Sequence, residues 1–218
     1  MDVLTMMSQR HSVRQYLNKK IEMPKRSLID QSVDMFNNVG GVNMKVFYDE
    51  PDAMNCAGAK LMKFENAKNY IALIGKEGDD EALGYFGEKL VFHLQVLELN
   101  SCWVAGTFDA KKCPVELEKD EKIFAIIVFG YGKSNGVAHK GKKADKVLKL
   151  IGEKPEWLDK GVAATLLAPT AMNAQNFKVI CDNGKVTIRS TGLSGKYNGI
   201  NLGILKCHFE MATKVTPD

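Results

Sequence analysis

Four residues between positions 10 and 14 could together bind a phosphate group. Arg10 and Arg14 carry guanidinium groups, which form paired, charge-assisted hydrogen bonds with phosphate oxygens. His11 and Ser12 lie between them and add an imidazole and a hydroxyl. A solvated basic helix end would contain the same residue types, so this segment alone leaves both interpretations open.

A second candidate segment, residues 168–177, is polar and turn-prone and lies between an apolar helix pattern and an expected strand. Its amide side chains could donate hydrogen bonds to a heteroaromatic ring edge and also accept them. In a plain loop the same side chains would bond their own backbone instead. The candidate binding residues here are Pro169, Thr170, Ala171 and Asn173.

The third segment, residues 101–108, follows the longest helical pattern of the chain. After Val104, the small residues Ala105 and Gly106 would let backbone N–H groups approach a ring nitrogen that gains electron density on reduction. An ordinary helix end followed by a turn would explain Gly106 but not the whole set.

The fourth segment is the basic cluster of Lys140, Lys142 and Lys143 in a glycine-rich stretch. It could complete an anion site, or it could be a solvated run of charge. The sequence contains no G-x-G-x-x-G, G-x-x-x-x-G-K-[ST], H-E-x-x-H or G-x-S-x-G motif. We therefore expect chemistry carried by a bound cofactor, and no metal site.

The composition fits a globular protein of 218 residues, with 45% hydrophobic and 26% charged residues. A net charge of +4, spread along the chain, argues against a nucleic-acid partner. No apolar run approaches the roughly 20 residues that span a bilayer, and residues 1–10 do not resemble a signal peptide. The five cysteines include no C-x-x-C pair. We expect reduced thiols, a cytoplasmic location and no membrane partner.

Hydrophobic patterns predict helices that begin near Asp2 or Thr5 and after Pro24, and a longer helix over residues 83–97 that is apolar almost all round. Apolar runs predict strands over residues 45–48, 70–74 and 124–129. The stretch 132–143 is expected to be a linker. Beyond it the patterns predict helices over 148–151 and 159–167, a hairpin through Asn183 and Gly184, and a final helix over 199–213.

Two weak matches between the halves of the chain suggest an internal duplication. Residues 45–49 resemble residues 178–182, and Gly84, Leu90 and His93 can be aligned with Gly199, Leu205 and His208. Each match could arise by chance. Both occur in the same order of helix, strand and long helix.

Together and in this order, the four segments resemble the motifs of the FMN-dependent nitroreductase family. Residues 10–16 match R-[RH]-S-x-[RK]-x-[FY], and residues 169–177 are similar to P-S-x-x-N-x-Q-P-W. Residues 100–106 look like G-x-x-W-x-G-G, and Gly130 and Tyr131 match the G-Y that ends the following strand. The lysines of the fourth segment correspond to the basic R-x-[RK]-[RK] cluster of the family.

The resemblance departs from the family at residues 39–43, where Pro, Ser and Gln of the P-S-x-x-N loop are missing and the intact-looking loop comes late instead. This arrangement resembles a subset of monomers that imitate the family homodimer. It implies an α+β nitroreductase-like fold with a central, mostly antiparallel sheet flanked by helices. A single domain, 1–218, would contain two similar lobes, about 1–135 and 136–218, with one FMN between them.

The resemblance implies an FMN-dependent oxidoreductase that passes electrons from NADH or NADPH to a small organic acceptor, such as a nitroaromatic or a quinone. The implied cofactor-binding residues are Arg10, His11, Ser12, Arg14, Val104, Ala105, Gly106, Lys140, Lys142, Pro169, Thr170, Ala171 and Asn173. Alternatives are an FMN-binding or sensor module without turnover, and a cofactor-free interaction domain. A monomer is expected, with a homodimer as the alternative.

Overall fold

The larger of two sheets is antiparallel, and its two central strands are deeply buried. The computed structural model describes residues 2–192 and 195–218. The sheet has the order β1-β2-β4-β3, formed by β1 (Asn43–Phe47), β2 (Tyr70–Gly75), β4 (Lys122–Gly130) and β3 (Asn100–Val104). Every residue of β2 is buried, as its continuous apolar run predicts. The sequence patterns do not predict β3, which pairs along one edge of β4.

The smaller sheet has the order β5-β6-β7, formed by β5 (Leu148–Ile151), β6 (Phe177–Asp182) and β7 (Lys185–Ser190). Strands β6 and β7 form the predicted hairpin, in which Asn183 (φ 48°) and Gly184 (φ 85°) both adopt the positive φ that a type I′ turn requires. The helix expected over residues 148–151 is wrong. These residues form β5, which pairs in parallel with β6, a distant contact that local periodicity cannot show.

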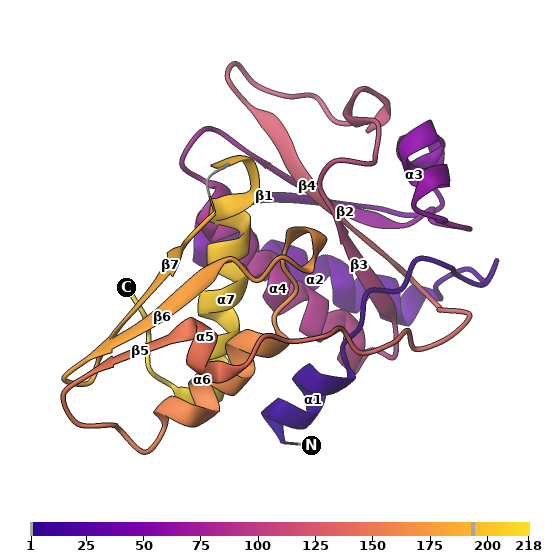
Figure 1. Ribbon diagram of the computed structural model, residues 1–218. Helices are drawn as coiled ribbons and strands as arrows, with labels where there is room; N and C mark the ends of the chain where they lie inside the picture. The colour runs from indigo at the N-terminus through magenta and orange to yellow at the C-terminus, as the bar shows by residue number, and fades with distance from the viewer. Residues whose placement is uncertain (1, 193–194) are drawn as a thin grey trace.

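Two helices, α4 (Asp80–Val96) and α7 (Asn198–Thr213), pack against each other between the two sheets (Figure 1). Their backbones approach closely at glycines. A Cβ atom at Gly84 would collide with the backbone of Ile200, and one at Gly203 would collide with the backbone of Glu81 and Tyr85. The helix pair therefore forms a tightly packed centre on which both sheets rest.

The other helices surround this centre. They are α1 (Val3–Gln9), α2 (Met23–Gly40), α3 (Ala57–Leu61), α5 (Ala144–Val147) and α6 (Leu158–Leu167), with single 3₁₀ turns η1 (Asp52–Met54), η2 (Ala110–Lys112), η3 (Ala171–Asn173) and η4 (Gly195–Tyr197). The helix predicted to begin near Asp2 or Thr5 is α1, which the Asp2 side chain caps, and Pro24 lies in the first turn of α2 as predicted. No helix in residues 2–192 and 195–218 is long and apolar enough to cross a membrane.

The predicted α+β class, with a mostly antiparallel sheet flanked by helices, is confirmed. The boundary proposed near residue 135 falls between the two sheets, since β4 ends at Gly130 and β5 begins at Leu148. The description of the halves as two repeated lobes stays a prediction.

Candidate functional site

The segment that follows α1 is extended and lies along the free edge of β3. Ser12 forms a parallel bridge with Ser101, and the Val13 N–H donates to the Ser101 carbonyl at 3.0 Å. Tyr16, which is 1% exposed, donates from its hydroxyl to the Val13 carbonyl at 2.6 Å. The first and third candidate segments are thus held together by backbone pairing and by a buried tyrosine.

Arg10 is buried at the end of α1, with 6% of its surface exposed. Its Nε atom lies 3.9 Å from Oε1 of Glu88 on α4, beyond hydrogen-bond distance, and is buried without a partner. Within residues 2–192 and 195–218, no group accepts a hydrogen bond from its Nη atoms. An unsatisfied buried guanidinium nitrogen is costly, so this geometry suits an anion close to Arg10.

His11 and Arg14 face the start of the basic stretch. Nδ1 of His11 lies 3.0 Å from the carbonyl oxygen of Asn135, while its Nε2 is buried without a partner. Arg14 lines an open pocket of about 430 Å³ and is unpaired among the side chains that the structure describes. The pocket is lined by Ser12, Val13, Arg14, Gln15, Met62, Lys63, Ser134 and Gly136.

Cys102 is a buried residue of β3. Burial raises the pKa of the Cys102 thiol, an effect that Arg14, Ser12 and Arg10 partly oppose. The neutral thiol fits a packing role for this cysteine.

The second and fourth segments are joined through Gln175, which is 1% exposed. Its Oε1 accepts from the Lys142 N–H at 2.6 Å, and its carbonyl accepts from Lys142 Nζ at 2.8 Å. The Asn173 side chain donates to the Lys140 carbonyl at 3.0 Å. The structure therefore uses the Lys142 ammonium to hold the loop, while Lys140 leaves its side chain exposed.

The loop itself contains three residues other than glycine with positive φ: Met172 (54°), Asn173 (51°) and Gln175 (47°). Asn tolerates this region better than Met, for which it is strained. The strained loop is pinned by hydrogen bonds from Ala171 N to Asn201 Oδ1 at 3.0 Å and from Gln175 N to Thr170 Oγ1 at 3.1 Å. Met172 is left 98% exposed at the tip.

The third segment turns away from the sheet after Val104, and its small residues lie next to the start of α7. A Cβ atom at Gly106 would lie 2.8 Å from the Tyr197 hydroxyl. Because Asn201 of α7 also holds Ala171, the first two turns at this end of α7 contact both the second and the third segments. Trp103, just before, donates from Nε1 to Glu88 Oε2 at 2.7 Å.

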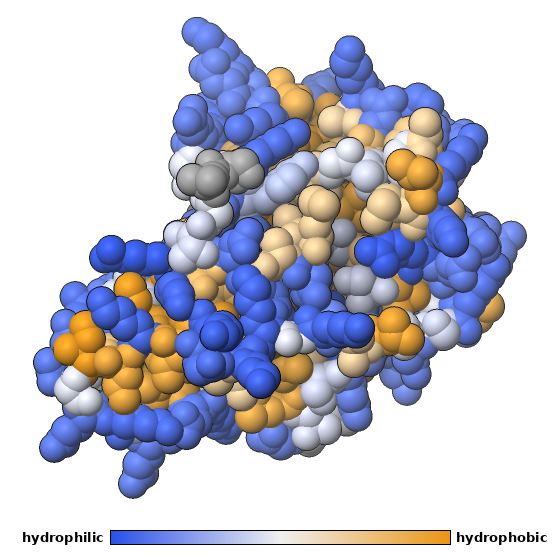
Figure 2. Space-filling view, viewed as in Figure 1, coloured by the Kyte–Doolittle hydropathy of each residue, from blue (hydrophilic) through white to orange (hydrophobic). Residues whose placement is uncertain are grey.

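The first and third segments are therefore joined at the edge of β3, and the second and fourth are joined through Gln175. Tyr197 and Asn201, at the start of α7, connect the second and third segments. Figure 2, viewed as Figure 1, shows a largely hydrophilic surface over the middle of the molecule and an apolar area toward the three-stranded sheet. No group of three or more potential metal-ligating His, Cys, Asp or Glu side chains occurs in the described part of the chain. Direct contact between the first and second segments is not among the interactions that the structure shows.

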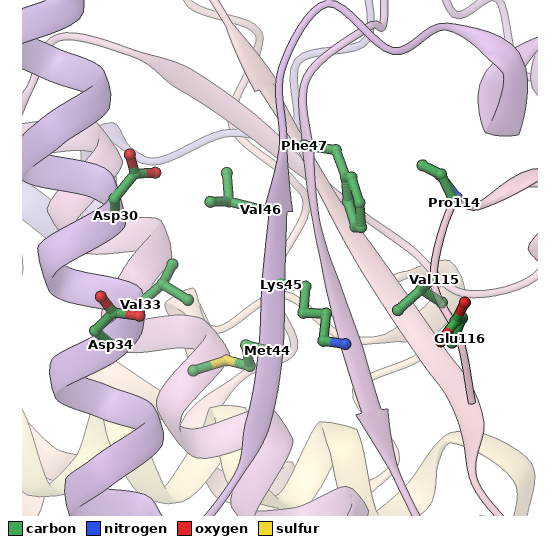
Figure 3. Close-up of a pocket in the computed structure, with 10 residues that line it drawn as sticks. All are labelled: Asp30, Val33, Asp34, Met44, Lys45, Val46, Phe47, Pro114, Val115 and Glu116. Atoms are coloured by element: carbon green, nitrogen blue, oxygen red, sulfur yellow. The ribbon is translucent and has the colours of Figure 1, made fainter. Parts of the chain in front are cut away.

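A larger pocket of about 610 Å³ lies elsewhere and contains none of the predicted site residues. Figure 3 shows it at the outer edge of β1, with Asp30 and Asp34 of α2 on one side and Val115 and Glu116 on the other. Size alone does not identify the site, because this pocket lacks the paired cationic and amide groups described above.

Sequence reasoning missed several residues of this region. Glu88 could have been found, because it is a charged residue on the buried face of an otherwise apolar helix pattern. Met172 carried no such signal, since its strained backbone and full exposure are visible only in the fold. Tyr197 and Asn201 were missed because their role depends on where α7 begins.

Comparison with known proteins agrees with this geometry. The family described as "Putative TM nitroreductase" matches residues 2–213. A search of curated proteins found no match. Among solved structures, one from Thermotoga maritima described as a "putative nitroreductase" is 22% identical, with a TM-score of 0.67, and the match covers 97% of this chain and 83% of that chain.

Two further structures match with lower coverage of this chain. A nitroreductase-family structure from Desulfovibrio desulfuricans, described as a complex with FMN, is 18% identical with a TM-score of 0.54, covering 70% of this chain and 96% of that one. A nitroreductase-like protein from Streptococcus mutans is 17% identical with a TM-score of 0.53, covering 66% and 95%. At these identities the structural matches establish the fold alone.

Fold and family match together define the class as a nitroreductase-type oxidoreductase. The chain belongs to the nitroreductase family whose profile spans residues 2–213.

Proposed function

We propose that the chain is an FMN-dependent oxidoreductase that takes electrons from NADH or NADPH and passes them to a small organic acceptor. The observation that carries the proposal is the cationic segment Arg10–Arg14, in which Arg10 is buried and the Nε atom of Arg10 and the Nε2 atom of His11 have no partner in the described chain. Both atoms belong to the segment that pairs with the edge strand β3 through Ser12 and Val13. Family membership and the FMN complex of the Desulfovibrio structure support the same cofactor.

The residues present fit FMN in charge and in chemistry. Arg10, Ser12 and Lys140 would hold the phosphate, and His11 lies next to them. Arg14 would supply positive charge near the pyrimidine edge, where it favours a reduced, anionic ring. Backbone N–H groups of Ala105 and Gly106, and the polar groups of Thr170 and Asn173, would surround the ring; the further lining residues are Val104, Lys142, Pro169 and Ala171.

FMN, when bound, supplies the redox chemistry: it accepts a hydride and passes electrons to an acceptor. The protein groups bind it, orient it and set its electrostatic surroundings. The exposed Met172 lies at the tip of the pinned loop, where it would contact an acceptor placed over the ring. The described residues supply no side chain that we assign as an obligatory acid or base.

We also propose that the chain carries a single FMN site, built from the first half by Arg10–Arg14 and from the second half by Pro169–Asn173. The reciprocal glycine contacts of α4 and α7 support a relation between the halves, because the weak repeat aligns these two helices. A monomer with one flavin per chain follows from this arrangement.

The test is the purified protein itself. We expect flavin absorption near about 450 nm, a stoichiometry of one FMN per chain, and bleaching by NADH or NADPH without oxygen. Colourless protein that also fails to take up added FMN would refute the proposal. Bound flavin that neither nicotinamide reduces would instead identify a flavin-binding or sensor module. Two flavins shared across a dimer would contradict the single-site arrangement.

A further inference from the structure

A buried cluster of four side chains joins four elements of the fold beneath the candidate phosphate site. Arg10 comes from the end of α1, Glu88 from α4, Trp103 from β3 and His208 from α7. Glu88 and His208 are both fully buried, and Arg10 is 6% exposed. Charged groups are rarely buried to this degree unless their charges are balanced.

The hydrogen bonds of His208 determine how protons are distributed in this cluster. Nδ1 lies 3.0 Å from the carbonyl oxygen of Ala164, which can only accept, so Nδ1 carries a hydrogen. Nε2 lies 2.9 Å from Oε1 of Glu88. Two lone pairs would repel at that distance, so a single proton lies between the imidazole and the carboxylate.

The shared proton makes the Glu88–His208 pair neutral as a unit, whichever of the two atoms holds it. Oε2 of Glu88 is occupied by the Trp103 N–H at 2.7 Å. Both carboxylate oxygens therefore have hydrogen-bond donors without Arg10, whose Nε stays 3.9 Å away. Adding the Arg10 guanidinium, the cluster carries one net positive charge.

The nearest other charged residues on these two helices, Lys89 and Glu210, are of opposite sign and partly exposed, so solvent screens them. In the described part of the chain, the only carboxylate within 4.0 Å of Arg10 is that of Glu88, whose charge the shared proton already balances. Because Arg10 is the member closest to the candidate site, a bound anion there would compensate it.

We propose that Glu88 and His208 are positioning residues for Arg10. Their shared proton makes the Glu88–His208 pair neutral, which leaves the guanidinium available for the FMN phosphate. This inference rests on the proposed function, since it takes FMN as the anion. It predicts that the charge of the cluster, not only its packing, sets the affinity for the phosphate end of the flavin.

His208→Gln tests the charge argument while it preserves most of the packing. The glutamine amide can still donate a hydrogen bond to Glu88, but it cannot transfer a proton to it. The carboxylate therefore keeps a full negative charge and forms an ion pair with Arg10. FMN affinity should fall about 10-fold to 100-fold, the range for one lost charge-assisted hydrogen bond. Riboflavin lacks the phosphate, and its affinity should change less than about threefold.

The double variant, with Glu88→Gln added to His208→Gln, removes the negative charge again. It should recover FMN affinity to within about threefold of the wild type, as should Glu88→Gln alone, in which neutral His208 accepts from the amide. A purely structural role predicts the opposite order, with the double variant at least as impaired as the single one. His93→Gln, on α4 beside Ser32, is the matched control and should bind FMN normally.

Binding is measured by quenching of flavin fluorescence, with circular dichroism to show that each variant is folded. A folded His208→Gln that binds FMN like the wild type would overturn the inference. So would a double variant with no recovery, or an equal loss for riboflavin. Wild-type protein that binds no FMN would overturn the proposed function and this inference with it, so the two failures are distinguishable. If His208→Gln does not fold, Glu88→Gln serves as the test. The ratio of its affinity for FMN to its affinity for riboflavin should match that of the wild type, and a lower ratio overturns the inference.

Discussion

After α2 the chain reaches β1 through Gly41 and Val42 alone, whereas after α6 it takes residues 168–176 to reach β6. We call these the early and the late junction. The early junction turns at Gly41, where φ is 60° and no side chain is strained. The Asn37 side chain closes it by bonding both the N–H and the carbonyl of Met44, each at 2.9 Å.

The extra residues of the late junction form a loop whose backbone is strained but which is anchored by hydrogen bonds. Three side-chain-bearing residues adopt positive φ there, and the buried Gln175 ties them to the basic stretch. The early junction shows that a helix can be connected to a strand without the length and the backbone strain of the late junction. Strained, well-anchored loops occur at functional sites, so this difference supports the ligand-binding role that we propose for the late junction.

The largest expected effect is at Gln175, which holds the late junction. Gln175→Ala would leave the Lys142 N–H without its side-chain acceptor. It would also remove one donor from the Leu166 carbonyl, which lies 2.9 Å from Nε2 of His139 as well. We expect the free energy of unfolding to fall by about 2 to 4 kcal/mol, measured by urea denaturation. The matched control at the early junction, Asn37→Ala, is partly exposed and should cost about half as much. Equal losses would mean that the two junctions are anchored alike.

Arg10→Ala tests whether FMN binding depends on the cationic segment after α1 and not on a positive charge near the early junction. Losing a charged hydrogen bond should weaken FMN binding by about 1.5 to 3 kcal/mol, seen by titration of flavin fluorescence. Lys45→Ala removes a positive charge close to the early junction and should leave FMN affinity unchanged. If both variants lost affinity equally, the effect would come from overall charge. An unchanged Arg10→Ala would place Arg10 outside the site.

Much of the fold was predictable because its signals are local. The apolar runs of β2 and β4, the pattern of α4, and the Asn183–Gly184 hairpin are all encoded within a few neighbouring residues. Strands β3 and β5 were not, since each is short and is stabilised by pairing with residues far along the chain. The same limit explains why residues 148–151 were assigned to a helix.

The candidate site was predictable as four segments but not as an arrangement. The residue types of Arg10–Arg14 suggest an anion, yet that Arg10 is buried beside Glu88 depends on how α1 meets α4. The amides of the late loop suggest hydrogen bonding, but Gln175 bonds the basic stretch, not a ligand. Proton sharing between Glu88 and His208 depends on the distance between two helices that are far apart in the sequence. The sequence spacing of the two residues does not predict that distance.

A smaller effect should appear in the backbone conformation of the two junctions. Gly41→Ala puts a Cβ at φ 60° and should lower the free energy of unfolding by about 1 to 2 kcal/mol. Met172→Gly relieves similar strain, partly offset by the greater freedom of glycine when unfolded, for a net gain of about 0.5 kcal/mol. Denaturant titration measures both changes. A loss of stability for Met172→Gly would show that the exposed side chain makes contacts that outweigh its strain.

The smallest effect concerns the acids that the repeat aligns at the ends of β1 and β6. The side-chain hydrogen bond from Arg26, at 2.6 Å, lowers the pKa of Asp49, and Lys68 adds to this. A lowered folded pKa stabilises the fold above the unfolded pKa of about 3.9, and this stabilisation is lost as the pH falls through the folded value. Asp49→Asn, suited to φ 54°, should therefore cost about 0.5 to 1 kcal/mol at pH 7 and almost nothing near pH 2. The matched variant Asp182→Asn, at an exposed position without a described ion pair, should show no such pH-dependent difference in urea unfolding. A cost at Asp49 that persists at low pH would assign its role to packing or to the turn, not to charge.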